Sequence, residues 1–316
     1  MSAVHSPAAP VAGRDPYRSR VGREPEVANR LDPVVYARPG APGPLTREQI
    51  TQYDHTGFLE LECLFSAAEI GTLKAELDSL REDASKVDPA TLIVEPDGRE
   101  LRSIFCIHEQ SKLFARLASD ERLAGAARYL LGDDVYIHQS RLNYKPGFFG
   151  KEFYWHSDFE TWHVEDGMPR MRALSMSIAL TENTEHNGPL MVIPGSHRRY
   201  VRCVGETPDD HYKQSLRRQE YGVPDPRSLQ QLYEESGGIV APRGPAGKVV
   251  VFDCNIMHGS NSNISPLPRS NVFLVFNAMS NRLVEPFGGK PPRPEFIATR
   301  QRVKQIKPVG DALAAS

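Results

Sequence analysis

The stretch VYIHQSRLNYK, residues 135–145, marks the point at which the sequence changes from helical to β-rich character. Further short apolar runs follow it, bounded by Gly, Pro and Asn: RALSMSIAL, PLMVIP, KVVVFDC and NVFLVFNAM. Short strands separated by turn signals are typical of a β-sandwich or barrel. Helical patterns do not alternate with these runs, which argues against a doubly wound parallel sheet. We therefore expect a mainly β fold with flanking helices, whose core over about residues 135–300 is a double-stranded β-helix (a cupin-like jelly roll).

The residues before this point predict a helical buttress over about 45–132. LTREQITQYDHTGFLEL indicates a short helix that enters a strand at residues 58–61. Ser66 and Glu69 form a capping box ahead of one apolar stripe, made of Ile70, Leu73, Leu77 and Leu80. A second helical stretch, SKLFARLASDERLAGAARYLLG, ends at Gly132, which suits a left-handed cap. We expect one domain over residues 31–316.

Two segments lie outside this plan. Residues 1–30 are rich in Pro, Ala and Arg without periodicity, so we expect a flexible N-terminal segment. The polar stretch from about 205 to 238, which contains the helix-like RSLQQLYEES, indicates an excursion from the barrel.

Composition limits the class of partner. The 316 residues are 40% hydrophobic, enough for a sizeable core. The 38 basic and 40 acidic residues are interleaved, so neither nucleic acid nor an anionic membrane is expected as a partner. Apolar runs stay short of the roughly 18 residues needed to span a bilayer, and the N-terminus lacks an apolar signal core. We expect a small-molecule substrate, a cytoplasmic location and reduced, structural thiols at Cys63, Cys106, Cys203 and Cys254.

A metal site is suggested by FYWHSDFETWH, residues 153–163. In an extended strand His156 and Asp158 would project from the same face. The third ligand that we predict is His258, because it follows the strand-like KVVVFDC and precedes a Gly/Ser/Asn turn at the mouth of a barrel. Each piece alone is more often a chance pattern or a turn residue. Together, two histidines and one carboxylate form the set that binds Fe(II) in non-haem oxygenases and leaves positions for co-substrate and O2.

Iron sites of this type commonly use a 2-oxo acid, whose distal carboxylate needs a cation. Arg269 stands ahead of NVFLVFNAM, where its guanidinium could point back into the barrel. Its planar fork can meet a carboxylate with two hydrogen bonds. Ser260 could donate a further hydrogen bond to the same group. An arginine taken alone is most often a surface charge. The position of Arg269, eleven residues after His258, favours the role of binding the co-substrate.

These motifs, together with NGPLMVIPGSH at residues 187–197, resemble the phytanoyl-CoA dioxygenase family of Fe(II)- and 2-oxoglutarate-dependent oxygenases. The resemblance covers most of the chain from DPVVY onward. Residues 153–197, SRLNYKPGF and DCNIMHGSNSN are most similar to the members that hydroxylate ectoine. The resemblance implies formation of 5-hydroxyectoine, a compatible solute that protects against osmotic and thermal stress. A homodimer would be unsurprising for this family.

The resemblance also implies residue roles. It implies that the three predicted ligands bind iron. Arg269 and Ser260 would bind 2-oxoglutarate, and Arg141 or Lys145 would assist in that binding. The substrate contacts that it implies are Gln139, Asn143, Thr161, Trp162, Phe276 and Arg293.

Simple chemistry agrees with part of this set, because ectoine carries an amidinium and a carboxylate. The face of Trp162 can hold the amidinium by a cation–π contact of about 0.5–2 kcal/mol, with Phe276 as a second wall. Arg293, in GGKPPRPEF, would pair with the carboxylate from a mobile loop that closes over the site. Core packing for the two aromatics and a solvated charge for Arg293 are the alternatives.

Two other functions stay open at this point. The same oxygenase chemistry would suit another small polar ring, such as proline, and relative turnover decides between the substrates. A jelly roll can also bind a solute without turnover, with zinc or no metal in the site. Metal analysis and oxygen consumption separate that case.

Overall fold

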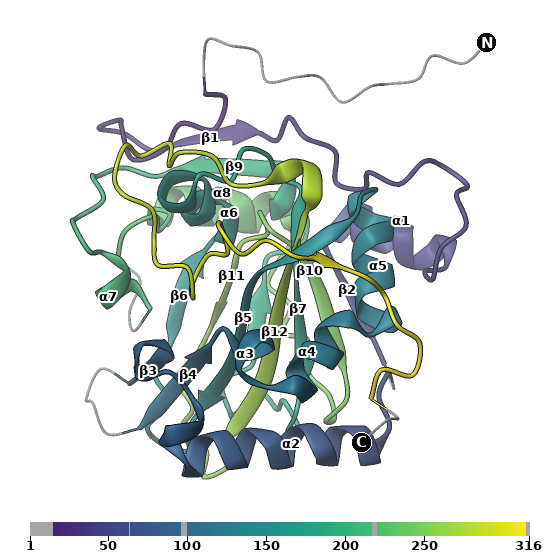
Figure 1. The fold of residues 1–316 in the computed structure, drawn as a ribbon. Helices are drawn as coiled ribbons and strands as arrows, with labels where there is room; N and C mark the ends of the chain where they lie inside the picture. Colours follow the sequence, from purple (N-terminus) through teal and green to yellow (C-terminus); the bar gives the residue numbers. More distant parts are fainter. Residues whose placement is uncertain (1–14, 63, 96–99, 217–219, 314–316) are drawn as a thin grey trace.

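Two antiparallel sheets form the centre of the chain (Figure 1). The structure is a computed structural model that describes residues 15–62, 64–95, 100–216 and 220–313. The larger sheet has the order β2-β10-β7-β12-β5-β4-β3, with β13 paired to β5, and the smaller has the order β6-β11-β8. The strands of the larger sheet are β2 (Phe58–Leu61), β3 (Leu92–Val94), β4 (Leu101–Phe105), β5 (Val135–Lys145), β7 (Ala173–Ala179), β10 (Val249–Asp253), β12 (Arg269–Ala278) and β13 (Gln305–Ile306). The smaller sheet consists of β6 (Phe153–His156), β8 (Leu190–Val192) and β11 (His258–Ser260).

Strand β10 shows how the sheets share the core. Val249 and Val251 belong to the large apolar cluster on the helix-covered side. Val250 and Phe252 belong to a cluster that also contains Leu190 of the smaller sheet. Alternate side chains of the strand are therefore buried on opposite faces, which explains its unbroken apolar run. The packing of the smaller sheet on the larger one gives the expected double-stranded β-helix.

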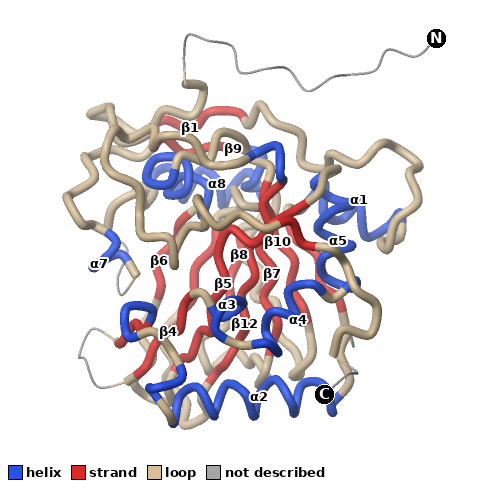
Figure 2. Tube along the Cα trace, in the orientation of Figure 1, coloured by secondary structure: helices blue, strands red, loops and turns tan. Residues whose placement is uncertain are grey.

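The helices before residue 135 pack on the larger sheet, as Figure 2 shows in blue around the red strands. They are α1 (Arg47–Thr56), α2 (Ala67–Glu82), α3 (Ile107–Gln110), α4 (Lys112–Ser119) and α5 (Glu121–Leu131). Helix α2 runs along the lower end of the strands in Figure 1, and its predicted capping box is confirmed. Its predicted stripe, Ile70 to Leu80, is buried in the same cluster as the sheet. Because the helices and the sheet share one hydrophobic core, they belong to one structural unit.

The helix predicted over residues 111–132 is in fact two helices. Asp120 has φ −58° and ψ 129°, which breaks the first helix, and its side chain accepts a hydrogen bond from the backbone N–H of Arg122. It thereby caps α5. Gly132 ends α5 with φ +57°, which confirms the predicted left-handed cap.

The expected flexibility of the N-terminal segment is wrong for residues 15–30. Strand β1 (Glu26–Asn29) pairs with β9 (Arg199–Arg202), and Tyr17 is only 1% exposed. Residues 1–14 lie outside the described residues. The order of residues 15–30 comes from distant partners, which the composition of a short segment does not reveal.

The excursion after residue 205 carries α7 (Tyr212–Ser215) and α8 (Pro226–Ser236), and the latter confirms the helix expected at RSLQQLYEES. Single 3₁₀ turns occur at Ala84–Lys86, Pro89–Thr91, Ser196–Arg198 and Met279–Asn281. Among the described residues, no helix is both long and apolar enough to cross a membrane. Cys106, Cys203 and Cys254 are buried free thiols, and Cys63 lies outside the described residues.

Candidate metal centre

His156 and His258 are direct neighbours across two strands of the smaller sheet. They face each other in the register of β6 and β11, and the centres of their rings lie 4.2 Å apart. Opposed residues of an antiparallel pair point to the same side of the sheet. Strand pairing therefore brings together two imidazoles that are about one hundred residues apart in the sequence.

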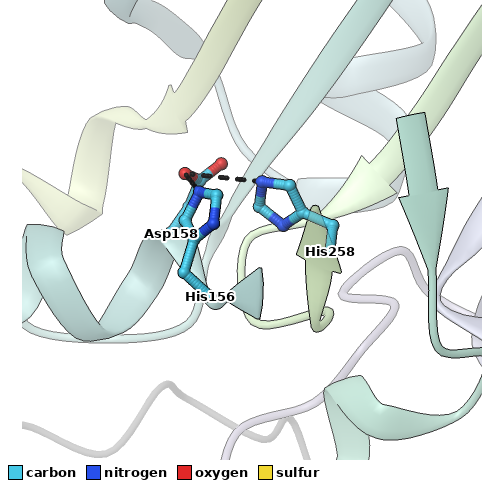
Figure 3. A group of neighbouring side chains, drawn as sticks. All are labelled: His156, Asp158 and His258. Atoms are coloured by element: carbon cyan, nitrogen blue, oxygen red, sulfur yellow. Dashed lines mark ion pairs between the residues drawn. The ribbon is translucent and has the colours of Figure 1, made fainter. Parts of the chain in front are cut away.

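Asp158 completes the group from a helix, not from the strand that we expected. Strand β6 ends at His156, Ser157 is extended, and Asp158 is the first residue of α6 (Asp158–Thr161). Its Oδ1 lies 3.6 Å from Nε2 of His156 and 3.8 Å from Nε2 of His258 (Figure 3). One ligand atom from each residue falls within 4.8 Å of the others. The predicted convergence is present, although the strand geometry used to predict it was wrong.

The outer nitrogens of both imidazoles are engaged. Nδ1 of His156 lies 2.8 Å from the carbonyl oxygen of Tyr154, and Nδ1 of His258 lies 3.0 Å from that of Ile256. Because a carbonyl only accepts, each Nδ1 carries the hydrogen. Each Nε2 then presents a lone pair toward Asp158, the tautomer that a metal ion requires.

A buried hydrogen bond joins the two turns that carry these ligands. The hydroxyl of Ser157 donates to Oδ1 of Asn255, 2.9 Å away. The amide of Asn255 donates in turn to the carbonyl oxygens of His197 and Arg199. The turn before α6 is thereby fixed to the turn before β11.

The charges of the group suit a cation. Burial acts to raise the pKa of the Asp158 carboxyl, but His258 and His156 hold that pKa well below its usual range. Burial, followed by the charge of His156, lowers the pKa of His258 to about 4. Near neutral pH Asp158 is therefore a carboxylate and His258 a neutral imidazole, the forms in which these side chains bind a transition metal.

A cavity beside this group opens between the two sheets. Six of the residues predicted for the site line it: Asn143, Arg141, His156, His258, Ser260 and Arg269. Arg102, Phe153 and Phe273 also line it and were not predicted from the sequence. The strand LRSIF carries no signal for Arg102, because an arginine in a strand is ordinarily exposed.

Arg269 is a buried cation that forms no ion pair with the described residues. Its residue is 3% exposed, and Nε and Nη1 have no hydrogen-bond partner among the described residues. Burial and the charges of Arg102 and Arg141 lower its pKa to about 10. Burying an unpaired charge is costly, so this guanidinium marks the cavity as a place for an anion.

Of the other predicted co-substrate residues, Ser260 and Arg141 line the same cavity, and Lys145 adjoins it through Ser260. Nζ of Lys145 donates to Oγ of Ser260 at 2.9 Å, which leaves the hydroxyl hydrogen of Ser260 free to donate elsewhere. Nη1 of Arg141 donates to Oε1 of Gln139 at 3.1 Å, and its Nε has no partner among the described residues. Gln139 donates to the carbonyl oxygen of Ile297 at 2.9 Å. Alternate positions of β5 thus supply one polar face.

The structure does not bring the predicted aromatic walls to this cavity. Trp162 is 3% exposed and packs in a separate apolar cluster with Met168 and Val275. Phe276 is fully buried in the large cluster on the helix-covered side of β12. Phe273, which faces the smaller sheet, lines the cavity instead. Both predicted aromatics occupy core positions, the alternative considered from the sequence.

Arg293 pairs with an acid of the chain and is not the solvated loop charge considered as the alternative. Its Nε and Nη2 donate to Oδ1 and Oδ2 of Asp166 at 2.8 and 2.5 Å. Both side chains are buried, at 7% and 0% exposure. Asp166 therefore occupies the guanidinium fork that was expected to meet the substrate carboxylate.

Asp166 ends a π-helix, Trp162–Asp166, that follows α6 directly. On this stretch Glu160 accepts from Nε and Nη2 of Arg20 at 3.0 and 2.7 Å, and Glu165 accepts from Nη1 of Arg20 at 2.6 Å. Nη2 of Arg20 also donates to the hydroxyl of Thr161 at 3.3 Å. We refer to Arg20, Glu160, Glu165, Asp166 and Arg293 as the paired cluster. Its acids were visible in FETWHVED, but its two arginines come from segments far away in the sequence.

Three comparisons with known proteins bear on this site. Residues 53–271 match the family model described as phytanoyl-CoA dioxygenase. An ectoine dioxygenase of Sphingopyxis alaskensis is 60% identical over 287 residues, which cover 91% of this chain and 94% of the relative. A crystal structure of EctD from S. alaskensis with 2-oxoglutarate and 5-hydroxyectoine matches with a TM-score of 0.87 and 53% identity, over 95% of this chain and all of that one. A crystal structure of the same protein with bound Fe matches with a TM-score of 0.85, 52% identity and the same coverage.

Proposed function

The chain belongs to the phytanoyl-CoA dioxygenase family, and from this premise we propose that it is an Fe(II)- and 2-oxoglutarate-dependent dioxygenase that hydroxylates ectoine to 5-hydroxyectoine. One observation carries the proposal. Two lone-pair imidazoles and a carboxylate converge at the wall of a cavity that also holds the unpaired guanidinium of Arg269. A metal-bound 2-oxo acid with a distal carboxylate fits these two features together.

The donor set suits Fe(II). Nε2 of His156, Nε2 of His258 and Oδ1 of Asp158 would hold the ion on one face, as the two-histidine, one-carboxylate set does in non-haem oxygenases. Bound iron supplies the activation of O2 with 2-oxoglutarate as reductant. The protein's own part is to keep both imidazoles in the required tautomer and the carboxylate ionised.

The co-substrate would lie along the cavity from the metal to β12. Arg269 would receive the distal carboxylate with a two-pronged hydrogen bond, and Ser260 would donate a further one. Lys145 orients Ser260 by donating to its oxygen. Arg141, with its Nε unpaired, stands beside the metal group and would meet the carboxylate or keto oxygen near the ion.

Ectoine would meet polar groups next to the metal. Gln139 and Asn143 flank Arg141 on β5, and Thr161 and Trp162 follow Asp158 on the same helical stretch. Trp162, Phe276 and Arg293 are kept as proposed contacts. Because all three are buried outside the cavity wall, each would act through the segment that it supports. The printed names of the relatives support ectoine over another small ring.

The test is a turnover experiment with purified protein. Supplied with Fe(II), 2-oxoglutarate and ectoine in air, it should release succinate and 5-hydroxyectoine in equal amounts. Proline is the matched competitor substrate, and faster hydroxylation of proline would move the assignment to that ring. Absence of succinate and of hydroxylated product in iron-loaded protein would leave a solute-binding module.

The proposal extends to the cellular location and the oligomeric state of the enzyme. We place the enzyme in the cytoplasm, where 2-oxoglutarate is available, and expect a homodimer. Cell fractionation and light scattering check these statements. A small-molecule substrate, without nucleic acid or membrane, remains the expected partner.

A further inference from the structure

A third arginine lines the cavity. Arg102 lies on β4, is 4% exposed and shares the cavity with Arg141 and Arg269. Its Nη1 donates to Oε2 of Glu95 at 2.8 Å, and its Nη2 donates to the carbonyl oxygen of Glu152 at 3.3 Å. Its guanidinium carbon lies 5.2 Å from the centre of the Phe153 ring. These contacts fix the guanidinium at the wall of the cavity.

Among the described residues, cations outnumber acids around the cavity. The cations are Arg102, Arg141, Arg269 and the adjoining Lys145, all buried or half-buried. The acids that act on them are Glu95, Glu152 and Asp158, and Glu95 pairs with Arg102. Besides burial, the charge of Arg102 contributes to a lower pKa at each of the other three cations. Such mutual repulsion is relieved when an anion enters.

We propose that Arg102 is a specificity-determining residue, which selects a dianionic 2-oxo acid over a 2-oxo acid with an uncharged tail. This inference rests on the proposed function, because it concerns the co-substrate of the same site. Arg269 would meet the distal carboxylate directly, and Arg102 would add a second positive charge to that end of the cavity. Glu95 would hold the guanidinium of Arg102 in place and limit the net charge.

The two partners of this pair should act in opposite directions. Removing the charge of Arg102 weakens the attraction for the distal carboxylate. Replacing Glu95 by Gln keeps an oxygen that accepts from Nη1 of Arg102, leaves one more uncompensated positive charge and does not weaken that attraction. A pair that served only to hold the fold would give the same kind of loss from either side, and the loss would not depend on the tail of the 2-oxo acid.

Equilibrium binding separates these cases without turnover. Anaerobic calorimetry on the Fe(II)-loaded full chain compares 2-oxoglutarate with 2-oxopentanoate, which has a methyl group in place of the distal carboxylate. In Arg102→Gln we expect the Kd of 2-oxoglutarate to rise about tenfold and that of 2-oxopentanoate to stay within about twofold. In Glu95→Gln we expect 2-oxoglutarate to bind as tightly as in the wild type or more tightly.

Two controls keep the test decisive. Arg81→Gln removes the same charge outside the cavity, where Arg81 lies 3.7 Å from the centre of the Tyr144 ring, and should leave the ratio of the two Kd values unchanged. Arg102→Lys keeps the charge and should keep the ratio within about threefold, so it and Glu95→Gln decide the case if Arg102→Gln does not fold.

The outcomes also separate this inference from the function on which it rests. If the wild type binds 2-oxoglutarate and Arg102→Gln keeps the wild-type ratio, the role of Arg102 is refuted while the enzyme assignment stands. The role of Arg102 is also refuted if Glu95→Gln raises the Kd of 2-oxoglutarate relative to the Kd of 2-oxopentanoate. If the iron-loaded wild type binds neither acid, the proposed function itself fails.

Discussion

The paired cluster and the cavity both bury arginines, but only the paired cluster supplies them with acids. Arg20 reaches Glu160 and Glu165, and all these side chains are almost fully buried. Arg269 is buried to the same degree, and its Nε and Nη1 have no partner in the part of the chain that the structure describes. A buried charge is stable only when it is paired. The cluster therefore holds the fold around the metal-bearing helix, and the cavity is completed by a ligand.

The largest effect should follow from breaking the paired cluster. Arg20→Gln leaves Glu160 and Glu165 buried without their cation and should lower the free energy of unfolding by about 3–5 kcal/mol. Urea denaturation measures it. The control is Arg198→Gln, which removes a half-exposed pair with Asp54 and should cost no more than about 1 kcal/mol. Equal losses of unfolding free energy in both variants would mean that the paired cluster does not stabilise the fold more than an exposed ion pair does.

Acid should weaken the same cluster next. Burial acts to raise the pKa of Glu165, but His211, Arg293 and Arg20 lower it to about 2. A folded-state pKa below the unfolded one gives stability that is present at higher pH and is lost as pH falls through about 4.5 toward 2. The contribution of Glu165 is about 3 kcal/mol.

Unfolding free energies of metal-free protein between about pH 5 and pH 3 measure this loss. Glu165→Gln lacks the titrating group and should show a shallower decline than the wild type. Parallel curves for the two proteins would refute the contribution.

Arg269 should respond in the opposite way to Arg20. Arg269→Gln removes an unpaired buried charge, so the free energy of unfolding of the ligand-free protein should stay the same or rise. The Kd of 2-oxoglutarate should rise by about 10- to 100-fold, because a charge-assisted, two-pronged hydrogen bond is lost. Denaturation and calorimetry on the same preparation measure both. If Arg269→Gln is destabilised as strongly as Arg20→Gln, the paired cluster and the cavity do not differ in how their arginines are compensated.

The smallest effect concerns the hydrogen bond that joins the ligand-bearing turns. Ser157→Ala removes the donor to Asn255 and should cost about 1 kcal/mol of stability. If the bond also positions Asp158 against His258, the Kd of Fe(II) should rise about fivefold. Ser19→Ala is the matched control, since it removes a buried serine hydrogen bond to Glu160, and should leave iron affinity unchanged. An unchanged iron Kd in Ser157→Ala would limit this bond to a structural role.

Local patterns predicted much of the fold. The capping box and stripe of α2 and the strand β5 over residues 135–145 are as expected, because they depend on neighbours in the sequence. The break at Asp120 was missed, since a cap inside an otherwise helical pattern looks like an ordinary helical residue. The order of residues 15–30 was missed because it depends on β9 and the paired cluster.

The site residues show the same difference between what local sequence predicts and what depends on distant segments. The ligands and Arg269 were predictable from motif spacing and from a family resemblance. Asp166 as partner of Arg293 and the side of β12 on which Phe276 lies were not predictable. They depend on packing between distant segments and on an irregularity of pairing between β12 and β5 next to Phe276. Arg102 was also not predictable, because an arginine in a strand is ordinarily exposed and the cavity that it lines is formed by distant segments.

The most direct test of the account asks whether Fe(II) and 2-oxoglutarate share one site. The iron-loaded protein is titrated with 2-oxoglutarate without oxygen, and the visible charge-transfer absorption of a metal-bound 2-oxo acid is followed. We expect a band that saturates at about one 2-oxoglutarate per chain and is absent in His258→Ala. A wild-type protein that binds 2-oxoglutarate equally well without iron, or that gives no band with both present, would contradict the account.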